Sequence, residues 1–388
     1  MSQFTPTFAP LTHLGNIPVH EFLRDYWQQK PLLVKNAFPD LENLISPEEL
    51  AGLSLEEDVR SRIIIQEHQE EHHFKVEHGP IDEALYSQLP EKLWTLLVQN
   101  CDSLDPRVNT LLNAFRFLPN WRLDDIMISY ATDGGGVGPH FDYYDVILLQ
   151  AQGKRRWRIG QNCSSASALV PDQEMKILQD FQTIEEYTVE PGDLLYIPAK
   201  VAHWGEAIGE CMTYSVGFRA PSHSDFILDY AQEVASQFTE DQRYRDVNLH
   251  KNKHPGEITD NNLAYFQNLM RDLSEDKQRI AHWLAEYSTR QEHTNDDASH
   301  ETFYETVDLL ILRSNQACRL SQQHRVCYFK GDELSNVYIN GQLWQCTPAL
   351  AQALSTYQCF QYSQFSESDQ NILEALTHQS LIECVTED

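Results

Sequence analysis

Two segments rich in glycine and proline constrain the fold of this chain more than any other feature. The first runs Gly-Gly-Gly-Val-Gly-Pro-His-Phe-Asp from Gly134 to Asp142, and the second begins with a Pro-Gly-Asp turn at Pro191 and ends at His203. Alternate side chains of a strand project from the same face, so His140 and Asp142 are expected to point to one side. A turn and a strand then bring His203 from a separate segment.

His140, Asp142 and His203 are the ligand set of non-haem Fe(II) oxygenases, two imidazoles and one carboxylate with open coordination positions opposite. A lone His-x-Asp is a common accident, and structural histidines are the alternative. The context favours a metal, because Gly134 to Gly138 permit a tight turn and the residues 145–149 form a buried apolar run. We therefore expect a metal centre in a β-barrel.

The rest of the chain before residue 222 predicts short strands, among them 94–98, 124–130 and 212–219. A hairpin turn is expected at Gln152-Gly153, and a helix over 111–118. Many short strands with turn signals and no alternating helices predict a closed or sandwiched β-fold.

The strand Lys154-Arg-Arg-Trp-Arg-Ile159 places several basic residues beside the expected metal site. One of them, at the floor of a barrel, could pair bidentately with a carboxylate, and a solvated basic edge is the alternative. Strand alternation leaves two choices for the inward-facing pair, either Arg155 and Trp157 or Lys154 and Arg156.

From residue 223 onward the apolar residues recur at helical spacing. Three helices are expected, over 225–238, over 263–273 and from 280, followed by a polar linker at 291–300. Their aromatic faces must be buried, either on the barrel or against a second copy, and we favour a homodimer.

The tail predicts a helix over 307–312, strands over 326–329 and 336–339, a hairpin at Asn340-Gly341, and two more helices. Helices around a β-wing suggest a winged-helix domain. Because it contains few Lys or Arg, we favour a protein-contact or scaffolding role over DNA binding. The expected organisation is therefore α+β, with domains at 1–222, 223–290 and 291–388.

The chain has 388 residues and a net charge of −29. This charge argues against direct binding of nucleic acid and suits a basic partner, with simple solubility an equal alternative. No apolar run is long enough for a membrane span, and the N-terminal residues lack a signal-peptide pattern. The eight cysteines are scattered without a Cys-x-x-Cys pair. We expect a reduced, cytoplasmic protein. The polar, His-rich segment 67–73 is expected to be solvated surface.

With these features established, the chain resembles the JmjC-type 2-oxoglutarate oxygenases, and specifically the ribosomal oxygenases, over nearly its whole length. The glycine-to-ligand segment is specific to this branch, whereas the Pro-Gly-Asp turn alone would indicate only the wider cupin barrel. The residues that carry the resemblance are Tyr26-Trp-Gln-Gln-Lys-Pro-Leu-Leu-Val34, Gly134 to Asp142, Gly153-Lys-Arg-Arg-Trp-Arg158, Pro191 to His203, and Tyr214-Ser-Val-Gly-Phe-Arg-Ala-Pro221.

This resemblance implies a double-stranded β-helix (the jelly-roll barrel of JmjC and cupin proteins), then a helical dimerisation region and a C-terminal winged helix. It implies an enzyme that uses Fe(II), 2-oxoglutarate and O2 to hydroxylate C3 of an arginine side chain in a basic, large-subunit ribosomal protein. The same chemistry on a histidyl or lysyl target is one alternative. A non-catalytic winged-helix adaptor with a vestigial barrel is another.

Carried over by motif position, the family's iron ligands fall on the two histidines and the aspartate already identified, and its anchor for 2-oxoglutarate falls on Arg155. The family's hydroxyl near that carboxylate corresponds to Ala131, where Ser129, Tyr130, Thr132 or a water could compensate. Its common asparagine corresponds to Thr213. The implied contacts to the target arginine fall on a carboxylate, a ring and a hydroxyl, namely Asp124, Tyr143 and Ser215.

Overall fold

The computed structural model describes residues 8–39, 41, 43–66, 73–246, 254–290 and 305–384. The expected linker at 291–300 and most of the His-rich segment, 67–72, lie outside these residues. The chain divides into two compact units, residues 1–220 and 221–388.

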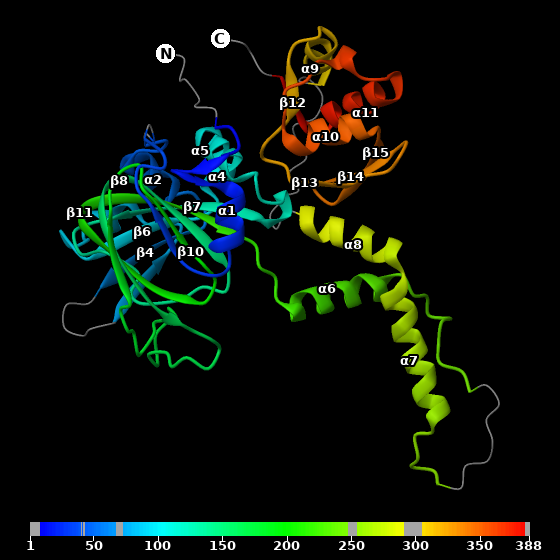
Figure 1. Ribbon diagram of the computed structural model, residues 1–388, viewed down its shortest axis with the longest axis horizontal. Coiled ribbons are helices and arrows are strands. Elements are labelled where there is room, and N and C mark those ends of the chain that lie inside the picture. Colours follow the sequence, from blue (N-terminus) through cyan, green and yellow to red (C-terminus); the bar gives the residue numbers. More distant parts are fainter. Residues whose placement is uncertain are drawn as a thin grey trace. The chain divides into compact units, whose positions relative to one another are not determined.

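The first unit is built on one antiparallel sheet that curves back on itself, drawn mainly in blue to green in Figure 1. Its strand order is β3-β10-β8-β11-β7-β6-β4-β5, and β9 pairs with the far half of β8. The sheet strands are β3 (Leu32–Val34), β4 (Ser61–Gln66), β5 (Phe74–His78), β6 (Trp94–Val98), β7 (Leu123–Ala131), β8 (Asp145–Asn162), β9 (Glu185–Val189), β10 (Leu194–Ile197) and β11 (Val201–Phe218).

Strands β8 and β11 are each 18 residues long and pair along their whole length. The hairpin expected at Gln152-Gly153 is wrong, because β8 continues through this point. Gly153 has a positive φ of 63°, and the pairing shifts between Ile208 and Met212 on β11, so both strands are irregular here without ending. Apolar residues from the two ends of β8, including Val146, Leu148, Trp157 and Ile159, belong to one buried cluster.

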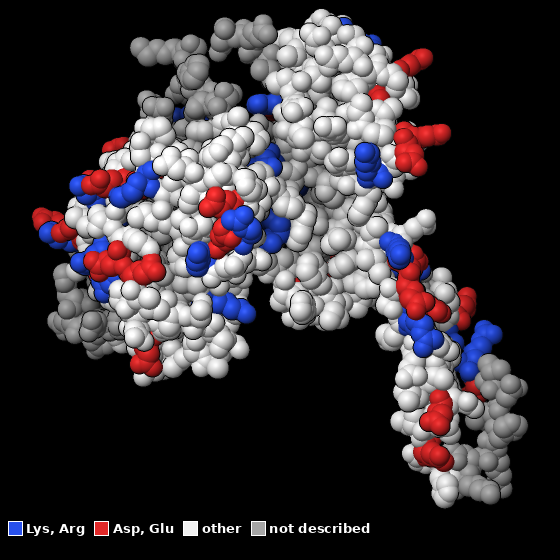
Figure 2. All heavy atoms as spheres, in the orientation of Figure 1, with Lys and Arg blue, Asp and Glu red and all other residues white. Residues whose placement is uncertain are grey.

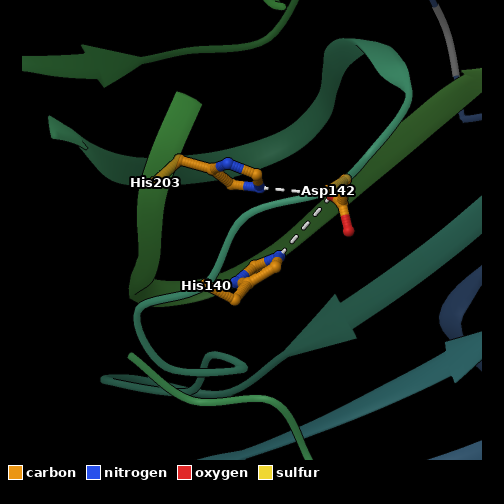
Figure 3. A group of neighbouring side chains, drawn as sticks. All are labelled: His140, Asp142 and His203. Atoms are coloured by element: carbon orange, nitrogen blue, oxygen red, sulfur yellow. Dashed lines mark ion pairs between the residues drawn. The ribbon is translucent and has the colours of Figure 1, made fainter. Parts of the chain in front are cut away.

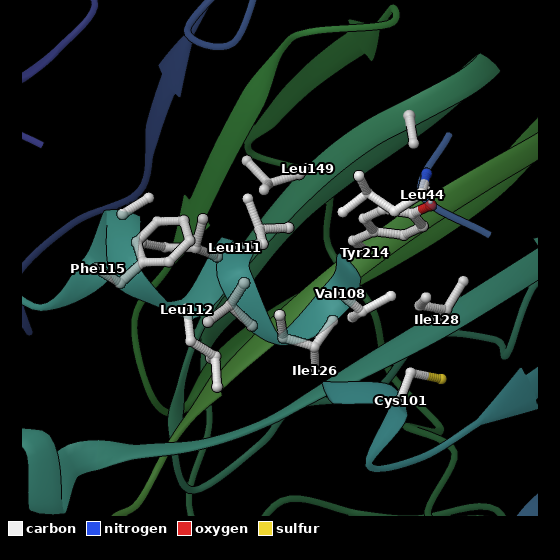
Figure 4. Packing of buried hydrophobic residues seen from close by; sticks show 14 of the residues in the cluster. Leu44, Cys101, Val108, Leu111, Leu112, Phe115, Ile126, Ile128, Leu149 and Tyr214 are labelled. Carbon is white, nitrogen blue, oxygen red and sulfur yellow. Dashed lines mark hydrogen bonds between the residues drawn. The ribbon is translucent and has the colours of Figure 1, made fainter. Parts of the chain in front are cut away.

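Short helices cover the face of the sheet that is opposite to the barrel interior. In Figure 4, Val108 and Leu111 of α5 (Pro106–Leu111) lie over Ile126 and Ile128 of β7. The helix expected over 111–118 is wrong in extent, because α5 ends at Leu111 and a 3-10 turn covers Leu112–Phe115. Proline at the first position and the Asp105 cap start α5.

The large buried cluster on this face also contains Tyr214 of β11, whose hydroxyl accepts hydrogen bonds from the backbone of Leu44 and Ile45 at 2.9 and 3.2 Å (Figure 4). This core packs the sheet against the helices. The remaining elements of the unit are β1 (His13–Leu14), β2 (Ile17–Pro18), α1 (Val19–Asp25), α2 (Pro47–Leu53), α3 (Glu83–Tyr86), α4 (Cys101–Leu104) and a 3-10 turn at Asn120–Arg122.

The second unit begins with three helices, as expected from the apolar spacing. These are α6 (His223–Ser236), α7 (Asp260–Glu275) and α8 (Lys277–Thr289). Trp283 of α8 packs against Phe226 and Tyr230 of α6, and its indole donates a hydrogen bond to Asp229 at 2.8 Å. No residue of α7 is buried.

The last elements form a small mixed module, coloured yellow-orange to red in Figure 1. A three-stranded sheet, β13-β14-β15, contains the hairpin predicted at Asn340-Gly341, where both residues have positive φ. The elements are α9 (Glu305–Arg313), β12 (Cys318–Leu320), β13 (Val326–Phe329), β14 (Ser335–Ile339), β15 (Gln342–Cys346), α10 (Pro348–Thr356), a 3-10 turn at Tyr362–Gln364, α11 (Glu367–His378) and β16 (Ile382–Cys384).

The charge of the chain is not gathered into one acidic surface on the face drawn in Figure 2. Groups of Asp and Glu lie beside groups of Lys and Arg there, separated by uncharged residues. Among the described residues, no helix combines the length and the apolar composition that a membrane span requires.

Candidate active site

The glycine segment brings two of the three candidate ligands into the barrel. It is not the regular strand that we expected, since residues 141–144 belong to no strand and His140 makes only an isolated bridge with His203. Backbone hydrogen bonds nevertheless tie the segment to β11, from Gly134 N to Ala207 O at 2.9 Å and from His203 N to His140 O at 2.8 Å. A Cβ on Gly136 would lie 2.3 Å from the Gly205 carbonyl oxygen, so this close approach requires glycine.

His140, Asp142 and His203 converge on one point (Figure 3). Their ligand atoms all lie within 4.8 Å of one another. The Asp142 carboxylate is 3.9 Å from Nε2 of His140 and 3.6 Å from Nε2 of His203. Donors about 2 Å from a shared ion lie up to about 4 Å apart, so a small divalent ion could contact this carboxylate and either imidazole together.

Hydrogen bonds fix the tautomer of both imidazoles. Nδ1 of His140 lies 2.9 Å from the Gly138 carbonyl oxygen, and Nδ1 of His203 lies 3.0 Å from that of Val201. A carbonyl only accepts, so each Nδ1 carries the proton and each Nε2 offers a lone pair towards Asp142. Burial, followed by the neighbouring His140, lowers the pKa of His203 to about 4, which keeps it neutral at pH 7. The donor set therefore fits a divalent metal.

Arg155 lies inside the barrel and is only 3 % exposed. Its guanidinium donates to Ser129 Oγ at 3.1 Å and to Thr213 Oγ1 at 3.3 Å, while its Nε has no hydrogen-bond partner. Burial lowers the pKa of this guanidinium. No carboxylate of the described residues forms an ion pair with it, and a buried cation of this kind is strongly stabilised by an anionic ligand.

A β-bulge lies near the start of β7. Ile126 pairs with Val216 and Leu123 with Phe218, so Asp124 and Asp125 together oppose the single residue Gly217. Such a bulge re-aims side chains and bends the strand. Atoms of both aspartates lie within 4 Å of the Cβ position of Gly217. The nearest Asp125 atom is Oδ1, at 3.2 Å, whereas the Asp124 atom is Cβ, at 3.8 Å, so it is the Asp125 carboxylate that lies near the face of β11 that carries Ser215.

The three residues predicted to contact a target side chain differ in their surroundings. Asp124 already accepts a hydrogen bond from Arg219 Nε at 3.1 Å, and the Tyr143 ring contacts Phe141, with centroids 5.2 Å apart. Ser215 is 8 % exposed, on the same strand face as Thr213. Tyr144 follows the metal ligand Asp142 by two residues, and desolvation of its phenol, followed by the charge of Asp142, raises its pKa.

The sequence reasoning missed Asp125, Tyr144 and Gln150. Gln150 Oε1 accepts a hydrogen bond from Thr213 Oγ1 at 3.0 Å and so orients a group that contacts Arg155. The sequence contains two consecutive aspartates and two consecutive tyrosines. Strand alternation does not predict which residue of each pair faces the site, because a bulge or an irregular segment reverses the direction of the side chains that follow it.

A comparison with protein families matches residues 110–226 to a model described as the JmjC domain. The chain is 36% identical, over 74% of its length and 76% of the relative, to the ribosomal protein uL16 3-hydroxylase of Escherichia coli. It is 37% identical to a probable ribosomal oxygenase of Haemophilus influenzae, over 65% of its length and 63% of the relative.

Solved structures agree with this relationship. A structure of YcfD, a ribosomal oxygenase from Escherichia coli, aligns with a TM-score of 0.81 at 30% identity and covers 97% of this chain and all of that one. The complex of YcfD with cobalt and 2-oxoglutarate aligns with the same TM-score at 31% identity, covering 96% and 99% of the two chains. The barrel, its metal-ligand geometry and this likeness over nearly the whole chain establish that the protein belongs to the JmjC-domain ribosomal oxygenases.

Proposed function

We propose that this protein is an Fe(II)- and 2-oxoglutarate-dependent hydroxylase that acts on an arginine side chain of a large-subunit ribosomal protein. The observation that carries the proposal is the combination of a His-Asp-His cluster with a buried arginine, Arg155, that has no carboxylate partner among the described residues. The curated relative named as a uL16 3-hydroxylase and the neighbour solved with cobalt and 2-oxoglutarate support the same chemistry.

His140, Asp142 and His203 would hold the metal, with the Nε2 atoms of the imidazoles and the carboxylate as ligands. Bound Fe(II), with 2-oxoglutarate and O2, would supply the oxidation that inserts oxygen into a C–H bond while 2-oxoglutarate is converted to succinate and CO2. The carbonyls of Gly138 and Val201 keep both imidazoles in the ligating tautomer without a further charged group.

Arg155 would bind the distal carboxylate of 2-oxoglutarate, because its Nε is buried without a partner and its guanidinium geometry matches a carboxylate. Ser129 and Thr213 hold that guanidinium from the neighbouring strands. Gln150 fixes the Thr213 hydroxyl in turn. The buried Trp157 ring lies 5.0 Å from the Arg155 guanidinium and would limit the access of water, which strengthens an ion pair.

The target side chain would enter beside the bulge, where the carboxylates of Asp124 and Asp125 favour a cation over a neutral group. Tyr144, Tyr143 and Ser215 would complete the acceptor pocket, a ring against the flat guanidinium face and a hydroxyl for alignment. Holding the reactive carbon next to the metal is then the main task of these residues.

The second unit supports the proposed organisation into a helical region at 223–290 and a winged-helix domain at 291–388. Leu263, Phe266 and Met270 share one face of α7 and are 52 %, 51 % and 62 % exposed in the single chain. An exposed apolar helix face of this kind favours a homodimer through the helical region. The β13-β14-β15 hairpins beside α10 and α11 resemble the wing and helices of a winged helix.

The protein would encounter a ribosomal substrate in the cytoplasm, and the net charge of −29 suits a basic protein partner rather than nucleic acid.

The decisive test supplies the purified protein with Fe(II), 2-oxoglutarate and large-subunit ribosomal proteins under air. We expect a gain of one oxygen mass on a single arginine, with one succinate formed per hydroxylation. Peptides in which that arginine is replaced by lysine, histidine or citrulline serve as matched controls. Modification of the lysine or histidine peptide instead would assign another target, and no succinate with any ribosomal protein would overturn the proposal.

A further inference from the structure

Two cysteines of the C-terminal module face each other across a pair of strands. β12 and β16 pair antiparallel, with Cys318 directly opposite Cys384. Their Sγ atoms are 2.8 Å apart, and no disulfide joins them in the structure. The two residues are far apart in sequence, so only the folded module brings their side chains together.

The backbone around this pair matches the geometry of a cross-strand disulfide. The backbone N–H and C=O of Cys318 both bond to Phe360, each at 2.8 Å, on the side away from Cys384. Cys318 and Cys384 are therefore a non-hydrogen-bonded pair, in which the Cα atoms of opposite residues lie about 4.5 Å apart. Disulfides span Cα separations of about 4.4–6.8 Å, so a bond needs no rearrangement of the strands.

Packing alone does not account for this arrangement. Buried cysteines often act as small apolar residues, as Cys346 does, and the residue paired with Cys346 across its strand is Ser335. Cys318 is fully buried, whereas Cys384 is only partly buried, so an added reagent is expected to react first at Cys384. Among the described residues, neither thiol belongs to a group of potential ligands that could hold a metal.

We propose that Cys318 and Cys384 form a site of reversible oxidation by a low-molecular-weight disulfide such as oxidised glutathione. The Cys384 thiolate attacks one sulfur of the reagent, whose disulfide breaks and releases one thiol. The Cys318 sulfur then attacks the Cys384 sulfur, and the mixed disulfide breaks to release the second thiol. The two protein thiols lose two electrons and two protons, which leave on the two reduced reagent thiols.

The new bond would enclose the chain from β12 to β16, including β13-β14-β15, α10 and α11. Closing a loop of this length restricts the unfolded chain and stabilises the folded module. Cytosolic disulfides are commonly transient and redox-sensing, so the bond would couple the stability of this module to the thiol redox state. This inference is independent of the proposed hydroxylase activity.

The test oxidises the reduced, full-length protein with oxidised glutathione, blocks the remaining thiols under denaturing conditions and maps them by mass spectrometry. We expect a peptide in which Cys318 is linked to Cys384, its loss on addition of dithiothreitol, and a rise of at least about 5 °C in the unfolding midpoint of the C-terminal module. The variant Cys384→Ser should lack both the linked peptide and the thermal shift.

Cys346→Ser is the matched control, because it removes a buried thiol of the same module and should leave the linked peptide unchanged. The exposed Cys359 reports whether the reagent has reacted at all. If Cys359 carries glutathione while Cys318 and Cys384 are both still alkylated, or if the bond joins Cys359 instead, the assignment is wrong.

Discussion

The two faces of the β7–β11 strand pair have opposite compositions and opposite tasks. Ile126, Ile128 and Val216 lie on one face, are fully buried and pack against helices. On the other face Ser129, Thr213 and Ser215 are also buried, but they meet Arg155 and the inside of the barrel. The residues of the two faces alternate along the same backbone.

This contrast shows how one pair of strands gives both stability and a precise site. The apolar face is held by many interchangeable contacts, so its residues contribute to the free energy of folding. On the polar face Ser129 and Thr213 have defined partners, and the buried guanidinium of Arg155 would be completed by an anionic ligand. Substitutions on the apolar face should therefore lower stability, and substitutions on the polar face should lower activity.

Loss of a metal ligand should give the largest change in activity. Replacing His140 or Asp142 by Ala removes one of three donors, and we expect succinate formation to fall by at least about 100-fold with an unchanged unfolding midpoint. Metal content and turnover are measured on the same samples. The exposed His20→Ala variant is the control, and turnover by the ligand variants at the control level would remove the metal centre from the mechanism.

Replacing Arg155 by Met should mainly weaken binding of 2-oxoglutarate. A buried charge pair that loses one partner costs about 2–5 kcal/mol, so KM for 2-oxoglutarate should rise by at least about 30-fold. KM for the protein substrate should change little. Arg156→Met, on the opposite face of β8 and paired with Glu206, is the matched control. If both variants raised KM for 2-oxoglutarate equally, the positive charge of Arg155 would act without the specific position of its guanidinium.

The neighbours Ile128 and Ser129 test the two faces directly. Ile128→Ala should lower the free energy of unfolding by about 2–5 kcal/mol, because it leaves a cavity in the core, while the folded protein keeps its KM values. Ser129→Ala should leave stability within about 1 kcal/mol and raise KM for 2-oxoglutarate several-fold, since Arg155 loses a partner. Denaturant titration and steady-state kinetics measure both, and an exchange of the two outcomes would contradict the division between faces.

Ala131→Ser should produce the smallest effect and sharpen the same contrast. Ala131 lies on the polar face, next to Ala207 and Cys211. One added hydrogen bond of about 1 kcal/mol would lower KM for 2-oxoglutarate by about 5-fold. Ala131→Val is the size control. A rise in KM with Ser would mean that this pocket has adapted to the smaller side chain.

Much of the fold and the metal site could be predicted from the sequence, because both depend on local signals. Apolar periodicity located the strands on either side of the glycine segment and the three helices after residue 223. The His-x-Asp pair and the distant His203 were chosen for their chemistry, and their side chains do meet. The strand assumed for His140 is absent, and the convergence comes from backbone pairing with β11 instead.

What the sequence did not predict depends on departures from regular pairing. Gly153 suggested a hairpin, but the strand continues there because β11 is irregular opposite it and the two remain paired. The bulge at Asp124 and Asp125 is defined only relative to Gly217 on the partner strand. Asp125 and Tyr144 were not predicted for this reason, since a shift of one residue turns every following side chain to the opposite face of the strand.

The regular pairing of β8 with β11 between His203 and Ala207 has a consequence for which diacids this enzyme can use. Arg155 pairs with Ala207, and His203 pairs with Ile159 four residues further along the same ladder, a backbone span of about 13 Å. Main-chain hydrogen bonds set that span. Side-chain substitutions would therefore alter how tightly a carboxylate binds, but not the length that a ligand needs to reach from the metal ligands to Arg155. Keto diacids with one carbon fewer or one more should therefore be poor substitutes, rejected by length rather than by charge.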